Sequence, residues 1–336
     1  MKIRILAIVL TLFMCVGVCG CIPLPLETET PIPEKTTLQE TTPSTTPTPT
    51  VSVSTPLLYK VTNENGNSVW LFGSIHVGRK DYFPLPDYVL NAFDNSEGLA
   101  VEFDIITFEN DLKTQMNALG KLVYKDGSTV KNHVSKELYD QASAILKENG
   151  LYNAMLGYYN ASFWSMYIDN CTMMQLGINS ELGVDLHLTK RANTKGIKIY
   201  EIESAEFQYS MMSEFSEELQ EYLLASSVNT YNDLENAKDD YKTLMDLWFE
   251  GDEKKLWDYL SASPEFKNEE EELPLYTEYN NAMMTERNEN MTEFVKKALE
   301  EGENLFVCVG AAHIVGDGAI VDNLRNEGYT VEIVKN

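Results

Sequence analysis

Two short motifs with the pattern Gly-x-x-His constrain the fold of this chain more than any other feature. They are residues 73–76 (GSIH) and 310–313 (GAAH), and each follows a continuous apolar run that is typical of a buried strand. A glycine at the end of the strand allows a sharp turn, so the histidine lies in the loop at the strand's carboxyl end. Open α/β sheets bind their ligands at this edge. We therefore expect two equivalent loops whose imidazoles face one site.

The sequence around each motif predicts an α/β fold. Each motif continues into a helix-like stretch and a second apolar strand, residues 99–103 in the first copy and 329–334 in the second. The pattern indicates a mixed central sheet built from two related strand-loop-helix-strand units. Between them, residues of about 108–300 carry apolar side chains at spacings of three and four, as in 137–148, 151–176 and 217–224, and predict a large helical insertion with one strand near 198–202.

The amino terminus predicts export. Residues 1–20 contain Lys2, Arg4 and an apolar stretch, a pattern typical of a secretory signal peptide. The sequence before Cys21 resembles a lipobox, so we expect a lipoprotein whose lipidated Cys21 holds it in the membrane, on the extracytoplasmic side of the cytoplasmic membrane. An ordinary cleaved signal or an uncleaved anchor is the alternative, and both also export the domain.

Residues 21–56 are dominated by threonine and proline, and we expect a disordered tether because the segment lacks apolar side chains that would offset the entropy of ordering. Residues 57–336 then form the folded domain. A formal net charge of −26 excludes a nucleic-acid partner, since phosphate binding requires a basic face. Outside the signal region only Cys171 and Cys308 remain, and either a disulfide or simple core packing accounts for them.

Three side chains are the candidates for chemistry. His76 and His313 occupy the two motif loops, and the second strand of the first unit carries Glu102 toward the same edge of the sheet. Two imidazoles and one carboxylate form a metal-ligand set that leaves positions for water and substrate. The alternative is that both histidines only make hydrogen bonds in their loops. Serine catalysis by Ser74 has little support, because the chain lacks the G-x-S-x-G pattern. His133 and His187 are interpreted as surface or structural residues.

Several phrases together resemble the TraB/GumN family, which includes the animal TIKI proteins. They are residues 71–78 (LFGSIHVG), 83–86 (FPLP), 101–104 (VEFD), 183–185 (GVD), 202–204 (IES), 247–252 (LWFEGD), 286–288 (ERN) and 309–316 (VGAAHIVG). The resemblance implies a fold related to the erythromycin esterase and ChaN group. It implies a core site of His76, Glu102 and His313, with Glu203 and Arg287 nearby. The TIKI proteins are divalent-metal-dependent proteases that favour manganese or cobalt, so the resemblance implies one of these ions.

The leading hypothesis is an exported, lipid-anchored, metal-dependent hydrolase, with a peptide or protein as substrate. His76 and His313 would bind the metal, and Glu102 would either complete the ligand set or act as general base. Arg287 would stabilise a developing oxyanion. The rival hypothesis is a surface lipoprotein that captures haem, metal or a peptide without turnover. The sequence does not predict the oligomeric state.

Overall fold

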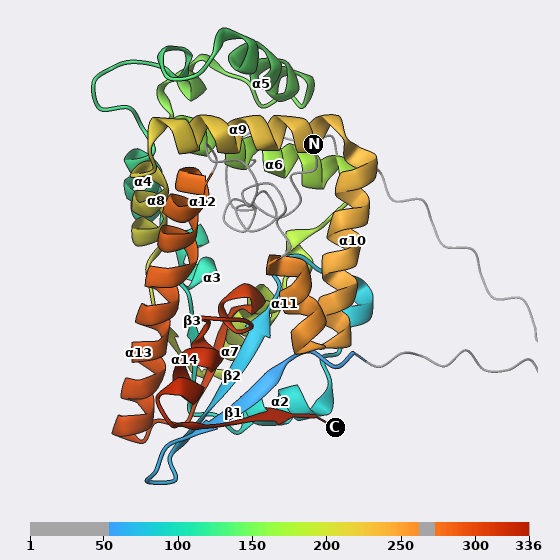
Figure 1. The fold of residues 1–336 in the computed structure, drawn as a ribbon, viewed down its shortest axis with the longest axis vertical. Coiled ribbons are helices and arrows are strands. Elements are labelled where there is room, and N and C mark those ends of the chain that lie inside the picture. Colours follow the sequence, from blue (N-terminus) through green and yellow to red (C-terminus); the bar gives the residue numbers. More distant parts are fainter. Residues whose placement is uncertain (1–53, 262–272, 336) are drawn as a thin grey trace, which may run out of the picture.

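The computed structural model describes residues 54–261 and 273–335. Its centre is a six-stranded mixed sheet with the strand order β4-β3-β5-β2-β1-β6, against which helices pack (Figure 1). The predicted α/β fold with a mixed central sheet and a large helical insertion is confirmed. The predicted signal peptide, Cys21 and nearly all of the predicted tether lie outside the described residues, so these assignments stay predictions.

The first two strands form a hairpin. Strands β1 (Leu58–Thr62) and β2 (Ser68–Ser74) pair antiparallel around the turn that contains Asn65 and Gly66. Gly66 has a φ of +85°, a conformation that L side chains rarely adopt, and this explains the glycine in the turn. The hairpin sets the position from which β2 delivers the first histidine loop.

The centre of the sheet is parallel. Strand β5 (Leu305–Gly310) lies between β2 and β3 (Gly98–Val101), and β4 (Lys198–Glu201) continues the parallel set beyond β3. Every residue of β5 is buried, which explains its unbroken apolar sequence. Because the four strands run in one direction, their carboxyl ends and the loops that follow reach the same edge of the sheet.

The two motif-bearing units differ in their last strand. In the first unit, α2 (Asp87–Asp94) leads into β3, which runs parallel beside β5. In the second, α14 (Ile320–Asn326) leads into β6 (Thr330–Val334), which runs antiparallel to β1 at the far edge. Both sides of β5 are already occupied by β2 and β3, so the last strand takes the next vacant edge. The two units are therefore alike in their first strand and histidine loop, and they differ in where the last strand lies.

Helices make up the insertion, although its boundaries differ from those that the sequence predicts. The segment expected to be one helix from residue 151 to 176 begins only at Ala161, where the Asn160 side chain accepts a hydrogen bond from the Phe163 amide. The α-helices are α3 (Ile105–Asn110), α4 (Leu112–Lys121), α5 (Lys136–Glu148), α6 (Ala161–Leu176), α7 (Val184–Lys195), α8 (Ala205–Ser213), α9 (Glu217–Asn232), α10 (Leu234–Glu250), α11 (Glu253–Ser261), α12 (Leu273–Asn280) and α13 (Glu286–Glu301). Short 3-10 turns are η3 (Lys80–Tyr82), η4 (Val130–Asn132), η5 (Ala154–Tyr158), η6 (Ser180–Leu182) and η8 (Ala311–His313), and η7 (Asn281–Thr285) is a π-helical turn.

The described residues form two hydrophobic clusters, one around the sheet and one within the helical insertion. Cys308 belongs to the first and Cys171 to the second, and both thiols are buried and free, so core packing is the correct interpretation. Trp248 of α10 donates a hydrogen bond from its indole nitrogen to the Gly73 carbonyl at 2.8 Å, which ties a helix of the insertion to the end of β2.

Among the helices described, none is both long enough and apolar enough to cross a membrane.

Candidate functional site

The register of the sheet brings the two histidine loops together. Ser74 is level with Gly310 on the neighbouring parallel strands β2 and β5, so both loops leave the sheet at the same height. The position of a β-carbon added to Gly73 lies 3.1 Å from both the Cα and Cβ atoms of Ala311. The first motif therefore uses glycine because the second loop passes close to its backbone.

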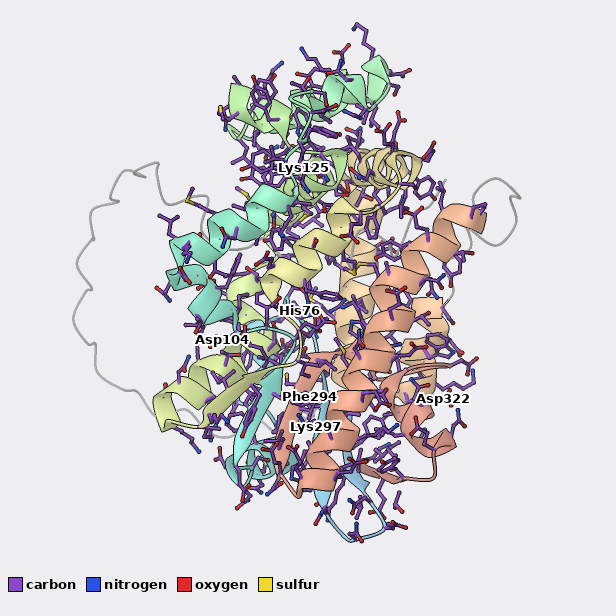
Figure 2. The ribbon with its side chains drawn as sticks, turned by 90° about the vertical axis from the view of Figure 1, so that its left-hand side faces the viewer. His76, Asp104, Lys125, Phe294, Lys297 and Asp322 are labelled. Atoms are coloured by element: carbon purple, nitrogen blue, oxygen red, sulfur yellow. The ribbon has the colours of Figure 1, made fainter. Side chains whose placement is uncertain are left out.

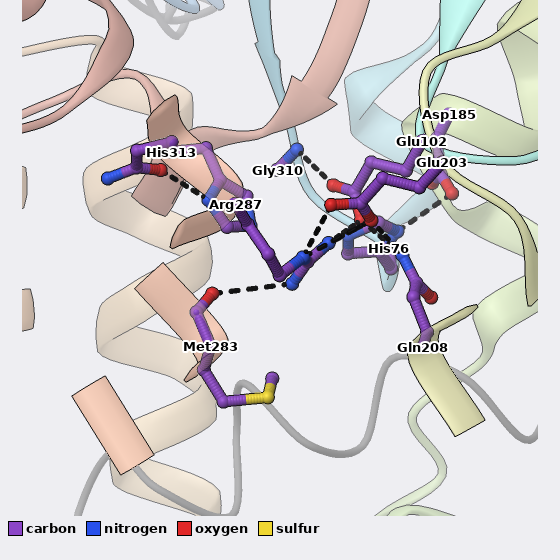
Figure 3. Close-up of polar contacts among 10 residues, drawn as sticks. His76, Glu102, Asp185, Glu203, Gln208, Met283, Arg287, Gly310 and His313 are labelled. Atoms are coloured by element: carbon purple, nitrogen blue, oxygen red, sulfur yellow. Dashed lines mark hydrogen bonds and ion pairs between the residues drawn. The ribbon is translucent and has the colours of Figure 1, made fainter. Parts of the chain in front are cut away.

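Glu102 lies at the same edge and is held by Arg287. The Nη2 atom of Arg287 lies 2.7 Å from Oε2 of Glu102 and 2.9 Å from Oε2 of Glu203 (Figure 3). The Nε atom of Arg287 lies 2.9 Å from Oε1 of Glu203. The Glu203 amide donates to the Glu102 carbonyl at 2.8 Å, which continues the pairing of β3 with β4 beyond both strands. Arg287 is only 1 % exposed, so this is a buried ion-pair network.

His76, Glu102 and His313 converge beside Gly310. A β-carbon added to Gly310 would lie 3.4 Å from Nε2 of His76, 3.4 Å from Oε1 of Glu102 and 3.7 Å from Cδ2 of His313. The Gly310 amide also donates to Oε1 of Glu102 at 2.8 Å. The residues that the sequence singles out as a core site are therefore brought together around one point, which a glycine leaves open.

Each histidine is oriented by a polar partner that the sequence reasoning did not select. Nδ1 of His76 lies 2.7 Å from Oδ2 of Asp185, and Nδ1 of His313 lies 2.7 Å from Oδ1 of Asn288. Since both partner oxygens accept, each Nδ1 carries the proton, and Nε2 is the nitrogen that would ligate a metal. Figure 3 shows His76 and Asp185 together on the Glu102 side of the site and His313 on the other side of Arg287.

The sequence signal for Asp185 was the GVD phrase, residues 183–185. Asp185 follows Gly183, where an added β-carbon would approach the His76 carbonyl to 2.5 Å, and the Val184 amide donates to the Ile75 carbonyl at 2.8 Å. The GVD phrase is therefore the segment that presses against the first histidine loop. Gln208 of α8 was also missed, and its amide nitrogen donates to Glu203 at 2.6 Å and to Glu102 at 3.3 Å.

A π-helical turn precedes the residues that α13 contributes. The turn η7 joins α12 to α13, and Arg287 and Asn288 follow directly after it. Successive residues of an α-helix are rotated by 100°, so the extra residue of a π turn changes which face the following side chains occupy. Local sequence patterns do not reveal this change, although it decides that Arg287 reaches Glu102 while Asn288 reaches His313.

The surroundings fix the charges of the site. Burial raises the pKa of Glu102, but the charges of Arg287 and the nearby histidines lower it by more. The net pKa of Glu102 therefore lies well below its usual range. Burial and the Arg287 charge lower the pKa of His313 to about 3, so this imidazole is neutral. Burial also lowers the pKa of His76, but Asp185 and Glu102 raise it by more, and the net pKa is above the ordinary value.

The donor chemistry of the site fits a divalent cation. Two imidazoles with Nδ1 held by hydrogen bonds and one ionised carboxylate surround the point beside Gly310, which is a common donor set for catalytic metals. Within residues 54–261 and 273–335, no three His, Cys, Asp or Glu side chains already lie at metal-ligand spacing. The residue types therefore suit a metal ion, but their side chains do not stand at metal-ligand spacing within the described residues.

The other two histidines have structural contacts, as the sequence reasoning expected. The His187 ring packs on Phe83 with its centroid 4.3 Å away. His133 stacks on Tyr124 at 4.0 Å, and its two ring nitrogens contact Glu217 and Ser128. Both residues are therefore suitable as control positions for substitutions at the site.

Comparison with known proteins gives one family. A model of the TraB/PrgY/gumN family matches residues 57–333. The Escherichia coli protein YbaP is 25% identical over 263 residues, covering 76% of this chain and 87% of YbaP. The human protein named metalloprotease TIKI1 is 25% identical over 308 residues, covering 78% of this chain and 59% of TIKI1. No solved structure matches.

Proposed function

The chain belongs to the TraB/PrgY/gumN family, and from this premise we propose that it is an exported, lipid-anchored, metal-dependent hydrolase that cleaves peptides. The observation that carries the proposal is the convergence of His76, Glu102 and His313 on the point beside Gly310. The distant similarity to a metalloprotease supports a metal ion as the cofactor and a peptide or protein as the substrate. Export and attachment through lipidated Cys21 rest on the amino-terminal sequence.

In the proposed mechanism, His76, His313 and Glu102 would hold the metal. When bound, such an ion lowers the pKa of a coordinated water and polarises the scissile carbonyl. The ion pair with Arg287 keeps Glu102 ionised over the whole neutral range. A general base works best with a pKa near the working pH, so this environment favours the ligand role for Glu102 over the base role. Manganese and cobalt are the ions proposed from the family resemblance.

Arg287 and Glu203 are proposed as positioning residues. The Arg287 donors contact Glu102, Glu203 and the Met283 carbonyl. To bind an oxyanion, as the sequence reasoning expected, this guanidinium would have to leave its carboxylate partners. Holding Glu102 in place is the role that the contacts support better.

The proposal is tested by digesting a peptide library with the purified protein and different divalent ions, while recording its absorption and metal content. Cleavage that depends on manganese or cobalt supports the hydrolase. A Soret band, or bound metal without cleavage under any ion, supports the rival assignment as a binding lipoprotein.

Replacing Asp185 is expected to weaken metal binding. Asp185→Ala removes the acceptor that orients His76, so the affinity for Mn²⁺ should fall roughly 10- to 100-fold. Asp185→Asn keeps an acceptor and loses the charge. Its affinity for Mn²⁺ should lie between that of the parent protein and that of Asp185→Ala. Calorimetric titration with Mn²⁺ measures the change. Equal affinities in all three proteins would remove Asp185 from the site.

Metal binding is expected to weaken as the pH falls. A metal must displace a proton from His76, whose pKa is raised by Asp185 and Glu102. Below that pKa the protonated imidazole competes with the metal, and the affinity should decline by about tenfold per pH unit. Binding measured between pH 6 and pH 8 shows the slope. In Asp185→Asn the decline should begin at lower pH, because one cause of the raised pKa is gone.

Gly310→Ala tests the shared point directly. The new methyl group would make ordinary van der Waals contacts, at 3.4 to 3.7 Å, with the three site residues. Gly310 has a φ of −51°, which alanine adopts without strain, so the fold should be retained. Since the methyl group fills the space of the ion, metal binding should fall by at least about tenfold. A variant that binds Mn²⁺ like the parent protein would contradict this location.

A further inference from the structure

A pocket opens beside the point on which His76, Glu102 and His313 converge, and His76 and Glu102 are part of its lining. The pocket has a volume of about 360 Å³ with its open mouth included, whereas ligand pockets span about 300–1,000 Å³. Because the mouth takes up part of this volume, the enclosed part has room only for a small group. A group bound there lies next to the proposed reaction centre.

One face of the sheet forms the first wall of the pocket. Val101 of β3 and Cys308 of β5 are partners in the parallel register, so their side chains point to the same face. Ser74 of β2 is level with Gly310, which lies two residues beyond Cys308, and the period of two places both on this face as well. The short serine and cysteine side chains leave space above the sheet. Since Gly310 shares the face, the pocket adjoins the point beside Gly310.

The segment after β3 forms a second wall, with Phe103 and Ile105. Asp104 lies between them in the sequence and caps α3, because its side chain accepts hydrogen bonds from two amides of the first helical turn at 3.1 Å. Figure 2 shows Asp104 at about the same height in the molecule as His76. The cap fixes Ile105 as the first residue of α3, where it is half-buried, whereas Phe103 is buried. Ile105 is therefore the wall residue whose size can be changed with least effect on the core.

Helix α7 forms a third wall, with Asp185 and Thr189 one helical turn apart. The Thr189 hydroxyl donates to the Asp185 carbonyl at 2.8 Å, which fixes the orientation of its side chain. Asp185 and Glu102 are the acidic groups of the lining, and no lysine or arginine is among the described residues that line the pocket. An acidic side chain of a substrate would therefore meet like charge.

We propose that this pocket binds the side chain of the substrate residue beside the cleaved bond, and that it selects small, uncharged side chains such as those of alanine and serine. The inference rests on the proposed peptide hydrolase. Val101, Phe103 and Ile105 give the pocket apolar walls, and a small side chain that replaces poorly ordered water between such walls gains affinity. The larger side chains of leucine and phenylalanine would collide with Ile105, which makes Ile105 the residue that sets the size limit.

The test uses the purified full chain and peptides of one sequence that differ only in the residue beside the cleaved bond. In the parent, kcat/KM for alanine and serine should exceed that for leucine, phenylalanine and lysine at least about tenfold. In Ile105→Ala the ratio of leucine to alanine should rise by about the same factor, and Ile105→Trp should lower kcat/KM for all the peptides. The matched controls are Ile106→Ala and Ile106→Trp, which change the next residue of α3, outside the lining, and should keep the preference of the parent.

A binding measurement separates this inference from the proposed hydrolase. Fluorescence anisotropy of the labelled peptides, with the protein kept free of metal by a chelator, should give the same order of affinities, and aspartate should bind at least about tenfold more weakly than asparagine. Preferential binding without cleavage would refute the hydrolase and support the pocket as a side-chain site, while cleavage without preference would do the reverse. A parent that prefers leucine, phenylalanine or lysine, equal effects in the Ile105 and Ile106 variants, or no binding of any peptide would overturn the proposal.

Discussion

Alanine at His76 or at His313 is expected to abolish metal-dependent cleavage. Each substitution removes one of the imidazoles that lie next to the point beside Gly310. A catalytic metal supplies several kcal/mol of transition-state stabilisation, and about 4 kcal/mol corresponds to roughly 1,000-fold in rate. We therefore expect kcat/KM to fall by about that factor or more in either variant, measured with a peptide identified from the library digest.

The controls for this result are His133→Ala and His187→Ala, which remove imidazoles from the helical region and from the Phe83 contact. Both should keep most of the activity. The far-UV circular dichroism of all four variants should match the parent, which would separate loss of the site from loss of the fold. Retained cleavage in both site variants would rule out the proposed metal centre.

Arg287→Met is expected to cause the largest loss of stability among single substitutions at the site. Arg287 is 1 % exposed, and its guanidinium contacts the buried carboxylates of Glu102 and Glu203. Methionine has a similar volume but leaves both carboxylates without their cation. Breaking a buried ion pair in this way costs about 3–5 kcal/mol, which urea denaturation at neutral pH measures.

The pH dependence identifies the cause of that loss. In the parent protein the pKa of Glu102 is held low, so its ion pair contributes stability above the pKa of the unfolded chain, and this contribution is lost as the pH falls through the low folded value. The difference between the parent and Arg287→Met should therefore shrink on acidification. The double variant Arg287→Met/Glu203→Gln should recover part of the loss. A difference that is constant with pH would indicate lost packing instead of lost charge pairing.

The core of the site was predictable because its elements are local. An apolar run, a glycine and a histidine in sequence specify a buried strand and a loop at its carboxyl end, and Glu102 directly follows a third such strand. Parallel strands then bring these three ends to one edge. The resemblance to a known family added Glu203 and Arg287, which the spacing of residues alone did not place.

The supporting residues were not predictable in the same way. Asp185 is 109 positions from His76, and no periodicity links the two, so only the GVD phrase of the family resemblance pointed to its segment. Asn288 and Arg287 depend on the rotation of α13 after the π turn, which local patterns do not encode. The role of Arg287 also changed, because only the contacts show that its donors meet two carboxylates and a carbonyl.

The sequence by itself determined the α/β class, the two histidine loops and the carboxylate that joins them, because glycines, apolar runs and strand ends act over a few residues. Tertiary structure decided the antiparallel position of β6 and the partners of both imidazoles. It also decided that Arg287 compensates the charge of the buried Glu102 carboxylate. The physical reason is that these features depend on which edges of the sheet remain vacant and on which distant side chains burial forces into contact.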